Sequence, residues 1–131
     1  MDDFINTIRK KVVDLTGIDA ENDLQIEGED FDNSDKTEWV SEFVSGGDFF
    51  QFSNQRTNAS GYIVEYDFFT KSGFSISESS KKANMCAEYF AGSSFDTEHY
   101  TIHVERVKVK NTVESKCNRS SLILTLFIQK R

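Results

Sequence analysis

The chain contains no proline, and only two of its 131 residues are cysteine. The lack of proline excludes proline-rich linkers and polyproline ligands. Two cysteines are too few for a disulfide framework, and neither has the neighbours of a metal site. Long apolar runs are also missing, which argues against a membrane-spanning helix. We therefore expect one soluble domain over residues 1–131, made inside the cell, with no metal and no cofactor.

Charges of both signs are present but unevenly distributed, and the net charge is −7. Residues 19–48 hold eleven acidic groups and one basic group, whereas residues 98–131 hold seven basic groups and three acidic ones. The negative balance argues against nucleic acid as the main partner. Regions of opposite sign suit head-to-tail contacts between subunits, or two partners of different charge. The alternative is two solvated faces that neutralise each other within one subunit.

Aromatic residues are abundant, with 12 Phe, 4 Tyr and 1 Trp. Such side chains dominate the energetics of both cores and interfaces. Phe49, Phe50 and Phe52 fall within four residues and cannot all face one small core. We predict that they make buried contacts between subunits, and the alternative is the aromatic core of a single subunit.

Apolar spacing predicts two helices. Residues 3–16 form the first, with apolar side chains every three to four positions at Phe4, Ile8, Val12 and Leu15. Gly17 provides a left-handed stop after it. A second helix is predicted from about residue 75 to residue 90, because Ser75 and Glu78 have the spacing of a capping box.

Strands are predicted where apolar residues alternate or run together. Residues 37–44 and 49–53 are expected to form a hairpin with its turn at 46–48. Further strands are predicted for residues 61–70, 99–110 and 121–128. The apolar pattern changes phase near Glu105 and Arg106, which indicates a bulge. A polar loop over residues 111–118 is expected to join the last two strands, and the final strand is apolar on both faces, as in the centre of a sheet or against a neighbouring subunit.

Residues 19–36 are predicted to form an acidic flexible loop, compatible with a short strand at 24–27. Asp30, Asp32 and Asp35 have some of the spacing of a calcium loop. The loop lacks the glycine and glutamate that an EF-hand requires at its sixth and twelfth positions, so calcium binding is not expected.

Two carboxylates, Glu65 and Asp67, are predicted to lie on one face of the strand 61–70. Paired carboxylates can perform acid–base chemistry. Because no third polar partner or histidine motif accompanies them, a solvent-facing or inter-subunit charged pair is the favoured interpretation, and no enzymatic activity is expected.

Three segments resemble the tail terminator proteins of long-tailed, siphovirus-type bacteriophages. Residues 8–18 resemble the opening helix of that family, and residues 37–40 resemble the start of its first long strand. Residues 61–73, with 83–90 after them, resemble its strand, turn and helix. The resemblance implies an α+β fold with an antiparallel or mixed sheet of four to five strands and two helices packed on one face.

The resemblance also implies a structural virion protein that acts by binding alone. Six copies would form a ring that caps the tail tube, stops its polymerisation and forms the head–tail joining interface. The implied partners are the tail tube protein and a head-completion or connector protein, without sequence-specific nucleic acid contact or a membrane. The protein would be in the host cytoplasm during assembly and then in the virion tail. The residues predicted to form opposed contact surfaces are Asp30, Asp32 and Asp35 on one side and Arg106, Lys108 and Arg119 on the other.

Other classes of protein remain open at this point. A different head–tail connector, an adaptor or a minor tail protein would share the aromatic, ring-forming character. A small α+β enzyme or ligand-binding domain requires a concave pocket with convergent polar groups. An acidic mimic of nucleic acid is opposed by the basic residues of 98–131.

Overall fold

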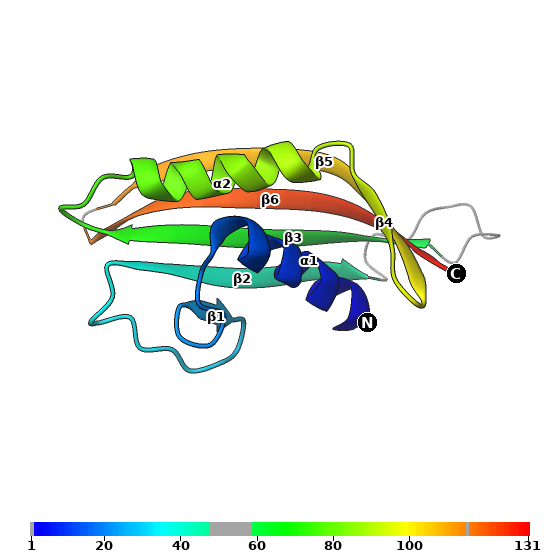
Figure 1. Ribbon diagram of the computed structural model, residues 1–131, viewed down its shortest axis with the longest axis horizontal. Helices are drawn as coiled ribbons and strands as arrows, with labels where there is room; N and C mark the ends of the chain where they lie inside the picture. The colour runs from blue at the N-terminus through cyan, green and yellow to red at the C-terminus, as the bar shows by residue number, and fades with distance from the viewer. Residues whose placement is uncertain (1, 48–58, 115) are drawn as a thin grey trace.

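The computed structural model describes residues 2–47, 59–114 and 116–131. In chain order these residues form α1 (Asp2–Thr16), β1 (Leu24–Ile26), β2 (Glu38–Gly47), β3 (Ala59–Lys71), α2 (Ser77–Phe90), β4 (Ser94–Asp96), β5 (Tyr100–Val113) and β6 (Cys117–Lys130). The strands form one sheet in the order β1-β2-β3-β6-β5-β4, and both helices lie on the same face of it (Figure 1). Only β1 and β2 pair in parallel among these strands, so the sheet is mixed. The predicted α+β class with two helices is confirmed.

The predicted number of four to five strands is wrong, because the sheet of the described residues has six. The additional strands, β1 and β4, have three residues each and extend the sheet at its two edges. Three residues are too few to show an alternating apolar pattern, so the second of these strands gave no signal in the sequence.

The acidic segment 19–36 contains β1 and is held together by side-chain bonds between its own residues. The carboxylate of Asp19 accepts hydrogen bonds from the backbone N–H groups of Glu21 and Asn22, at 3.0 and 3.2 Å. Lys36 Nζ lies 2.8 Å from Asp23 Oδ1. The segment is therefore more structured than a plain loop.

The core lies between the helices and one face of the sheet. β3 and β6 contribute alternate residues to it: Val64, Tyr66, Phe68, Leu122, Leu124, Leu126 and Ile128. The helices contribute apolar residues at helical spacing: Phe4, Ile5, Ile8, Val12, Ala83, Cys86 and Phe90. β6 lies between β3 and β5, which confirms the first of the two expectations for the last apolar run, namely a central strand.

Both strands of the final hairpin, β5 and β6, are longer than predicted. The expected polar loop 111–118 is wrong, because β5 continues to Val113 and β6 begins at Cys117. Polar residues are accommodated there because the strand ends face solvent. The predicted bulge is confirmed by a register shift between Val104 and Arg106.

The predicted capping box at the start of α2 is also wrong. The N-cap residue is Ile76, and it makes no side-chain capping bond. Ser75 Oγ instead accepts a bond of 3.1 Å from the N–H of Ser77. The first turns of α2 are attached to the sheet by other contacts, namely a hydrogen bond between the hydroxyls of Ser79 and Thr70 and an ion pair of 3.0 Å between Lys82 and Glu38.

A buried ion pair attaches α1 to the sheet. The guanidinium of Arg9 donates two hydrogen bonds to the carboxylate of Glu42 on β2, at 2.7 and 2.9 Å. The hydroxyl of Tyr66 on β3 donates a third bond of 2.7 Å to the same carboxylate. Glu42 is only 2% exposed, so these donors replace the water that the carboxylate loses on folding.

We expect Arg9→Met to destabilise the fold by about 3 kcal/mol, because it leaves a buried carboxylate without its cationic partner. Adding Glu42→Gln should recover part of the loss, since a neutral amide can still accept from Tyr66. The measurement is the free energy of unfolding in urea, with Lys10→Met as the exposed control on the same helix. Equal losses in Arg9→Met and Lys10→Met would contradict this role of the ion pair.

The predicted turn at residues 46–48 is wrong for Gly46 and Gly47, which belong to β2 and pair with Tyr62 and Gly61. Gly46 has a φ of +126°, and a Cβ there would lie 2.5 Å from the carbonyl oxygen of Gly61. Glycine is thus required by the close approach of two strands rather than by a turn.

We expect Gly46→Ala to lower the free energy of unfolding by at least roughly 2 kcal/mol, because strain and overlap add. Gly17 is the matched control, since its φ is +72° but a Cβ there meets nothing within 4 Å. Gly17→Ala should therefore lose about 1 kcal/mol from the left-handed conformation alone. Equal thermal unfolding of the two variants would show that the overlap has no effect.

Candidate functional site

One face of the sheet is left uncovered by the helices. Along β3, Val64, Tyr66 and Phe68 point into the core, so the alternate residues Ile63, Glu65 and Phe69 point to the opposite face. In the described chain no helix lies on that face (Figure 1). The register places the following residues on it: Trp39, Ser41, Phe43, Ile63, Glu65, Asp67, Phe69, Arg106, Lys108, Lys110, Arg119, Ser121, Ile123, Thr125 and Phe127.

The two carboxylates that the sequence singled out lie at the centre of this face. Burial, followed by the hydrogen bond and the negative charge of the neighbouring Asp67, raises the pKa of Glu65 to about 7. Arg119 and Lys110 act in the opposite direction on the same pKa. Near neutral pH the pair can therefore hold one shared proton.

The basic neighbour of this pair is Arg119 on β6, whose Nη1 lies 4.0 Å from Asp67 Oδ2. Its Nη2 lies 3.2 Å from Glu114. Two buried atoms on this face, Asp67 Oδ1 and Arg119 Nε, have no hydrogen-bond partner within the described part of the chain. A buried carboxylate oxygen without a donor is costly, and a proton on Glu65 can supply that donor.

Apolar side chains surround the charged group. The rings of Trp39 and Phe69 stack with their centroids 5.2 Å apart and an angle of 11° between their planes. Ile123 and Phe127 on β6 are half-buried, and Phe43 on β2 is 42% exposed. The uncovered face therefore combines apolar surface with charges of both signs, which is the composition of an interaction surface.

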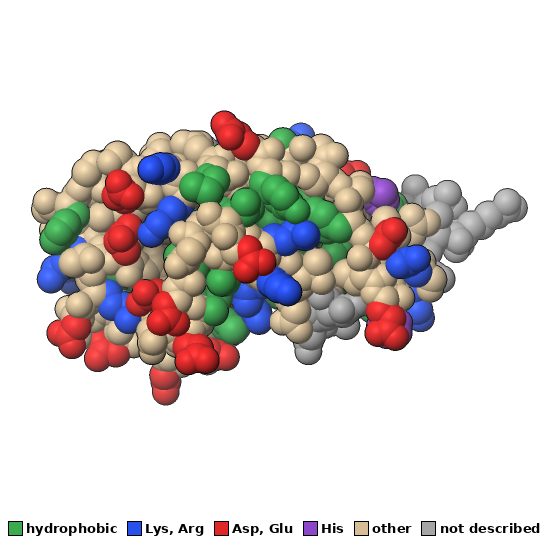
Figure 2. Space-filling model, in the orientation of Figure 1, with side chains coloured by type: hydrophobic (Ala, Val, Ile, Leu, Met, Phe, Trp, Pro, Cys, Tyr) green, Lys and Arg blue, Asp and Glu red, His purple; other side chains and the backbone are tan. Residues whose placement is uncertain are grey.

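The predicted opposed contact surfaces lie at opposite edges of the sheet. Asp30, Asp32 and Asp35 are exposed in the connection between β1 and β2, and acidic side chains gather along that lower edge of Figure 2. Arg106 and Lys108 are exposed on β5, near the other edge. Arg119 does not join them as a free cation, because it lies on central β6 and pairs with Glu114. Phe49, Phe50 and Phe52 lie outside the described residues.

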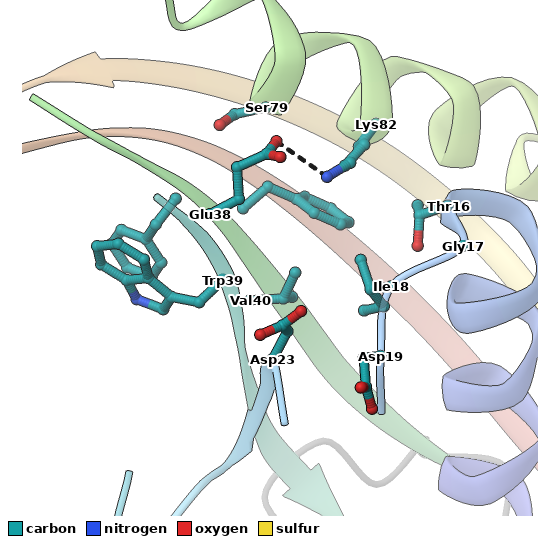
Figure 3. Close-up of a pocket in the computed structure, with 12 residues that line it drawn as sticks. Thr16, Gly17, Ile18, Asp19, Asp23, Glu38, Trp39, Val40, Ser79 and Lys82 are labelled. Carbon is teal, nitrogen blue, oxygen red and sulfur yellow. Dashed lines mark hydrogen bonds and ion pairs between the residues drawn. The ribbon is translucent and has the colours of Figure 1, made fainter. Parts of the chain in front are cut away.

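A cavity of about 250 Å³ lies between the end of α1, β2 and α2 (Figure 3). Its charged groups already have partners within the chain: Lys82 pairs with Glu38, and Asp23 pairs with Lys36. Asp19 accepts hydrogen bonds from its own turn. The cavity thus does not present the free, convergent polar groups that an enzyme site requires.

Among the described residues, no group of three or more His, Cys, Asp or Glu side chains could hold a metal ion. None of their helices is sufficiently long and apolar to cross a membrane.

The sequence pattern predicts Glu65 and Asp67 as a pair but gives no sign of the basic groups beside them. Arg119 and Lys110 reach the pair from β6 and β5, which are more than forty residues away in the chain. Alternation along each strand could have assigned each of these residues to one face of its own strand. Only the strand order shows that they lie beside Glu65 and Asp67 on the same face of the sheet.

No protein family model and no curated protein matches the chain. A solved structure of a protein without a functional description is similar over 100% of this chain and 96% of its own, with a TM-score of 0.67 and 9% sequence identity. At this identity the similarity shows the fold alone, and it supports the α+β arrangement of helices on one side of a sheet.

We expect Glu65 to titrate near pH 7 and Asp67→Asn to lower the pKa of Glu65, because the substitution removes the negative charge beside it. Carboxyl carbon chemical shifts measured by NMR between pH 3 and pH 9 test this directly. Glu88→Gln, a change of an exposed carboxylate on α2, is the control and should leave the titration unchanged. Titration of Glu65 at its ordinary value of 4.5 in the unmodified protein would contradict the interpretation.

The raised pKa of Glu65 makes the free energy of unfolding depend on pH. Because the folded pKa lies above the ordinary value, the folded chain binds the proton more tightly than the unfolded chain. The contribution of Glu65 is therefore complete below about pH 4.5 and is lost as the pH rises through about 7. Solvent screens this half-exposed group and keeps the effect small. It is measured as the difference in unfolding free energy between the wild type and Glu65→Gln.

Proposed function

We propose that the protein is a phage tail terminator, a structural virion protein whose ring, a hexamer, caps the tail tube. The ring stops tube polymerisation and offers its other surface to the head-completion or connector protein. The sequence resemblance suggests this function, and the α+β fold with two helices on one face of a sheet is the arrangement that the resemblance implies. The proposed mechanism is binding alone, without a catalytic step.

The observation that carries the proposal is the separation of charge to opposite edges of the sheet. The acidic connection with Asp30, Asp32 and Asp35 lies beside β1 and β2, whereas Arg106 and Lys108 lie on β5. A contact between unlike edges is heterologous, and repeated heterologous contacts close into a ring when their rotation allows it. Opposite charges at such edges favour the correct orientation and accelerate association.

The edge formed by β5 is available for such a contact over much of its length. Within the described chain, β4 pairs with β5 only at Thr101, Ile102 and His103. The segment after the bulge carries Arg106, Lys108 and Lys110 on one face. Charged residues on a strand edge prevent unspecific pairing of strands but allow a complementary acidic partner.

A different connector, adaptor or minor tail protein shares these features, so the test must detect capping itself. Purified tail tube subunits are polymerised with and without the protein, and tube lengths are measured by electron microscopy. We expect short tubes with a ring at one end. Continued elongation at saturating protein would overturn the proposal.

A triple variant tests whether the acidic edge is a ring contact. Replacing Asp30, Asp32 and Asp35 by Asn should weaken ring closure and lengthen the tubes, because the attraction to the basic edge is lost. The control removes the same number of charges from exposed positions elsewhere, at Glu78, Glu88 and Glu98. Equal capping by both triple variants would show that the acidic edge is not a ring contact.

A further inference from the structure

The uncovered face carries acidic and basic groups in matching positions across its central strand. Glu65 on β3, Ile123 on β6 and Lys108 on β5 occupy one rung of the sheet. Asp67, Ser121 and Lys110 occupy the next rung. On both rungs a carboxylate and an ammonium group lie on opposite sides of β6.

We propose that a second copy of this chain docks on the uncovered face, related to the first by a twofold axis that runs along β6. Such a rotation exchanges the two sides of β6 and keeps each rung at its level. β3 of one copy then lies over β5 of the other. Glu65 meets Lys108 of the second copy, Asp67 meets Lys110 of the second copy, and the symmetry makes each contact twice.

The centre of the proposed contact is apolar. Ile123 lies on the axis and meets its own symmetry mate, and Phe127 lies further along the same strand. Phe69 on β3 adds apolar surface beside the axis, whereas Trp39 and Phe43 on β2 lie outside the overlap of the two copies. Apolar residues at the centre with charges around them are typical of specific protein interfaces.

The size of the face fits a reversible dimer. β2, β3, β6 and β5 lie side by side, and β2 pairs with β3 over five rungs that point to the uncovered face. With the axis along β6, only β3, β6 and β5 of the two copies overlap. With strands about 4.8 Å apart and rungs about 6.8 Å apart, this overlap covers about 490 Å² of flat sheet per copy. Specific interfaces bury about 800 Å² per partner, with weaker ones below that value.

The charges around Glu65 also favour a second copy of the chain as the partner of the uncovered face. The charged groups around Glu65 are Asp67 on β3, Arg119 on β6, and Arg106, Lys108 and Lys110 on β5, whereas β2 contributes the uncharged Ser41 and Phe43. Glu65 is partly exposed on this face, so an ammonium group from a second copy can reach its carboxylate and supply both a hydrogen-bond donor and the counter-charge.

This inference does not depend on the proposed function. Lys108 contacts an acidic edge in the ring but contacts Glu65 in the dimer, so one copy cannot use it for both at once. The face-to-face dimer would therefore compete with ring closure. The acidic connection of Asp30, Asp32 and Asp35 has no part in the dimer, which separates the two proposals experimentally.

The test is sedimentation velocity of the full-length protein over a wide range of concentration. We expect a monomer–dimer equilibrium that Lys108→Glu and Glu65→Lys each weaken at least roughly tenfold, because each creates two like-charge contacts per dimer. The double variant, Glu65→Lys with Lys108→Glu, exchanges the charges and should restore dimerisation. Lys81→Glu, the same change at an exposed site on α2, is the control.

The inference would be overturned by a monomer at all concentrations, by a dimer that Lys108→Glu does not weaken, or by a double variant no better than the single ones. Circular dichroism of each variant identifies any loss of folding, and recovery in the double variant excludes it as the cause. A hexamer without a dimer would overturn the twofold contact while leaving the ring proposal intact.

The pH dependence provides a second measurement. Ionised Glu65 is the form that pairs with lysine, and its pKa in the single copy is about 7. Dimerisation should therefore strengthen between pH 6 and pH 8, by roughly tenfold for each Glu65–Lys108 contact when pairing returns the pKa to its ordinary range. Glu65→Gln should remove this dependence. A dimer equally strong at both pH values would contradict the contact.

Discussion

The arrangement of the whole subunit depends on the buried carboxylate of Glu42, which Arg9 and Tyr66 hold with three hydrogen bonds. Arg9 belongs to the N-terminal helix, whereas the other two residues belong to adjacent strands. The bonds therefore fix α1 over β2 and β3 on the same side as α2. A buried ion pair contributes little net stability compared with apolar packing, but an unpaired carboxylate at that position is strongly unfavourable. Alternative positions of the helix are thus disfavoured.

With both helices on one side, the opposite face of the sheet has no covering element in the described chain. That face is not an ordinary polar exterior, because it carries stacked aromatic rings, half-buried Ile123 and a carboxyl pair beside Arg119. The elevated pKa of Glu65 results from the same geometry, since two carboxylates share a partly desolvated site. Surfaces of this composition are common where proteins associate, and both assembly proposals use its basic strand β5.

Much of the local structure was predictable. The two helices follow from apolar spacing, and the bulge after Val104 follows from a change of phase in the alternation. β1 falls within the short strand that the sequence allows at 24–27. The edge strand β4 and the extended ends of β5 and β6 could not be predicted in the same way, because the partner strand decides them. Gly46 was interpreted as part of a turn, although the contact of its backbone with Gly61 is what requires glycine.

The candidate site, like the fold, is predictable from local sequence only in part. Alternation of side chains along a strand is sufficient to place Glu65 and Asp67 on one face, and composition is sufficient to assign acidic and basic residues to different segments. The pairing of strands in the folded sheet is what places Lys108 on the same rung as Glu65, brings Arg119 close to Asp67, and separates the acidic connection from β5 at opposite edges. The reason is that the strand order β1-β2-β3-β6-β5-β4 arises from packing and hydrogen bonds between distant segments, which local periodicity does not encode.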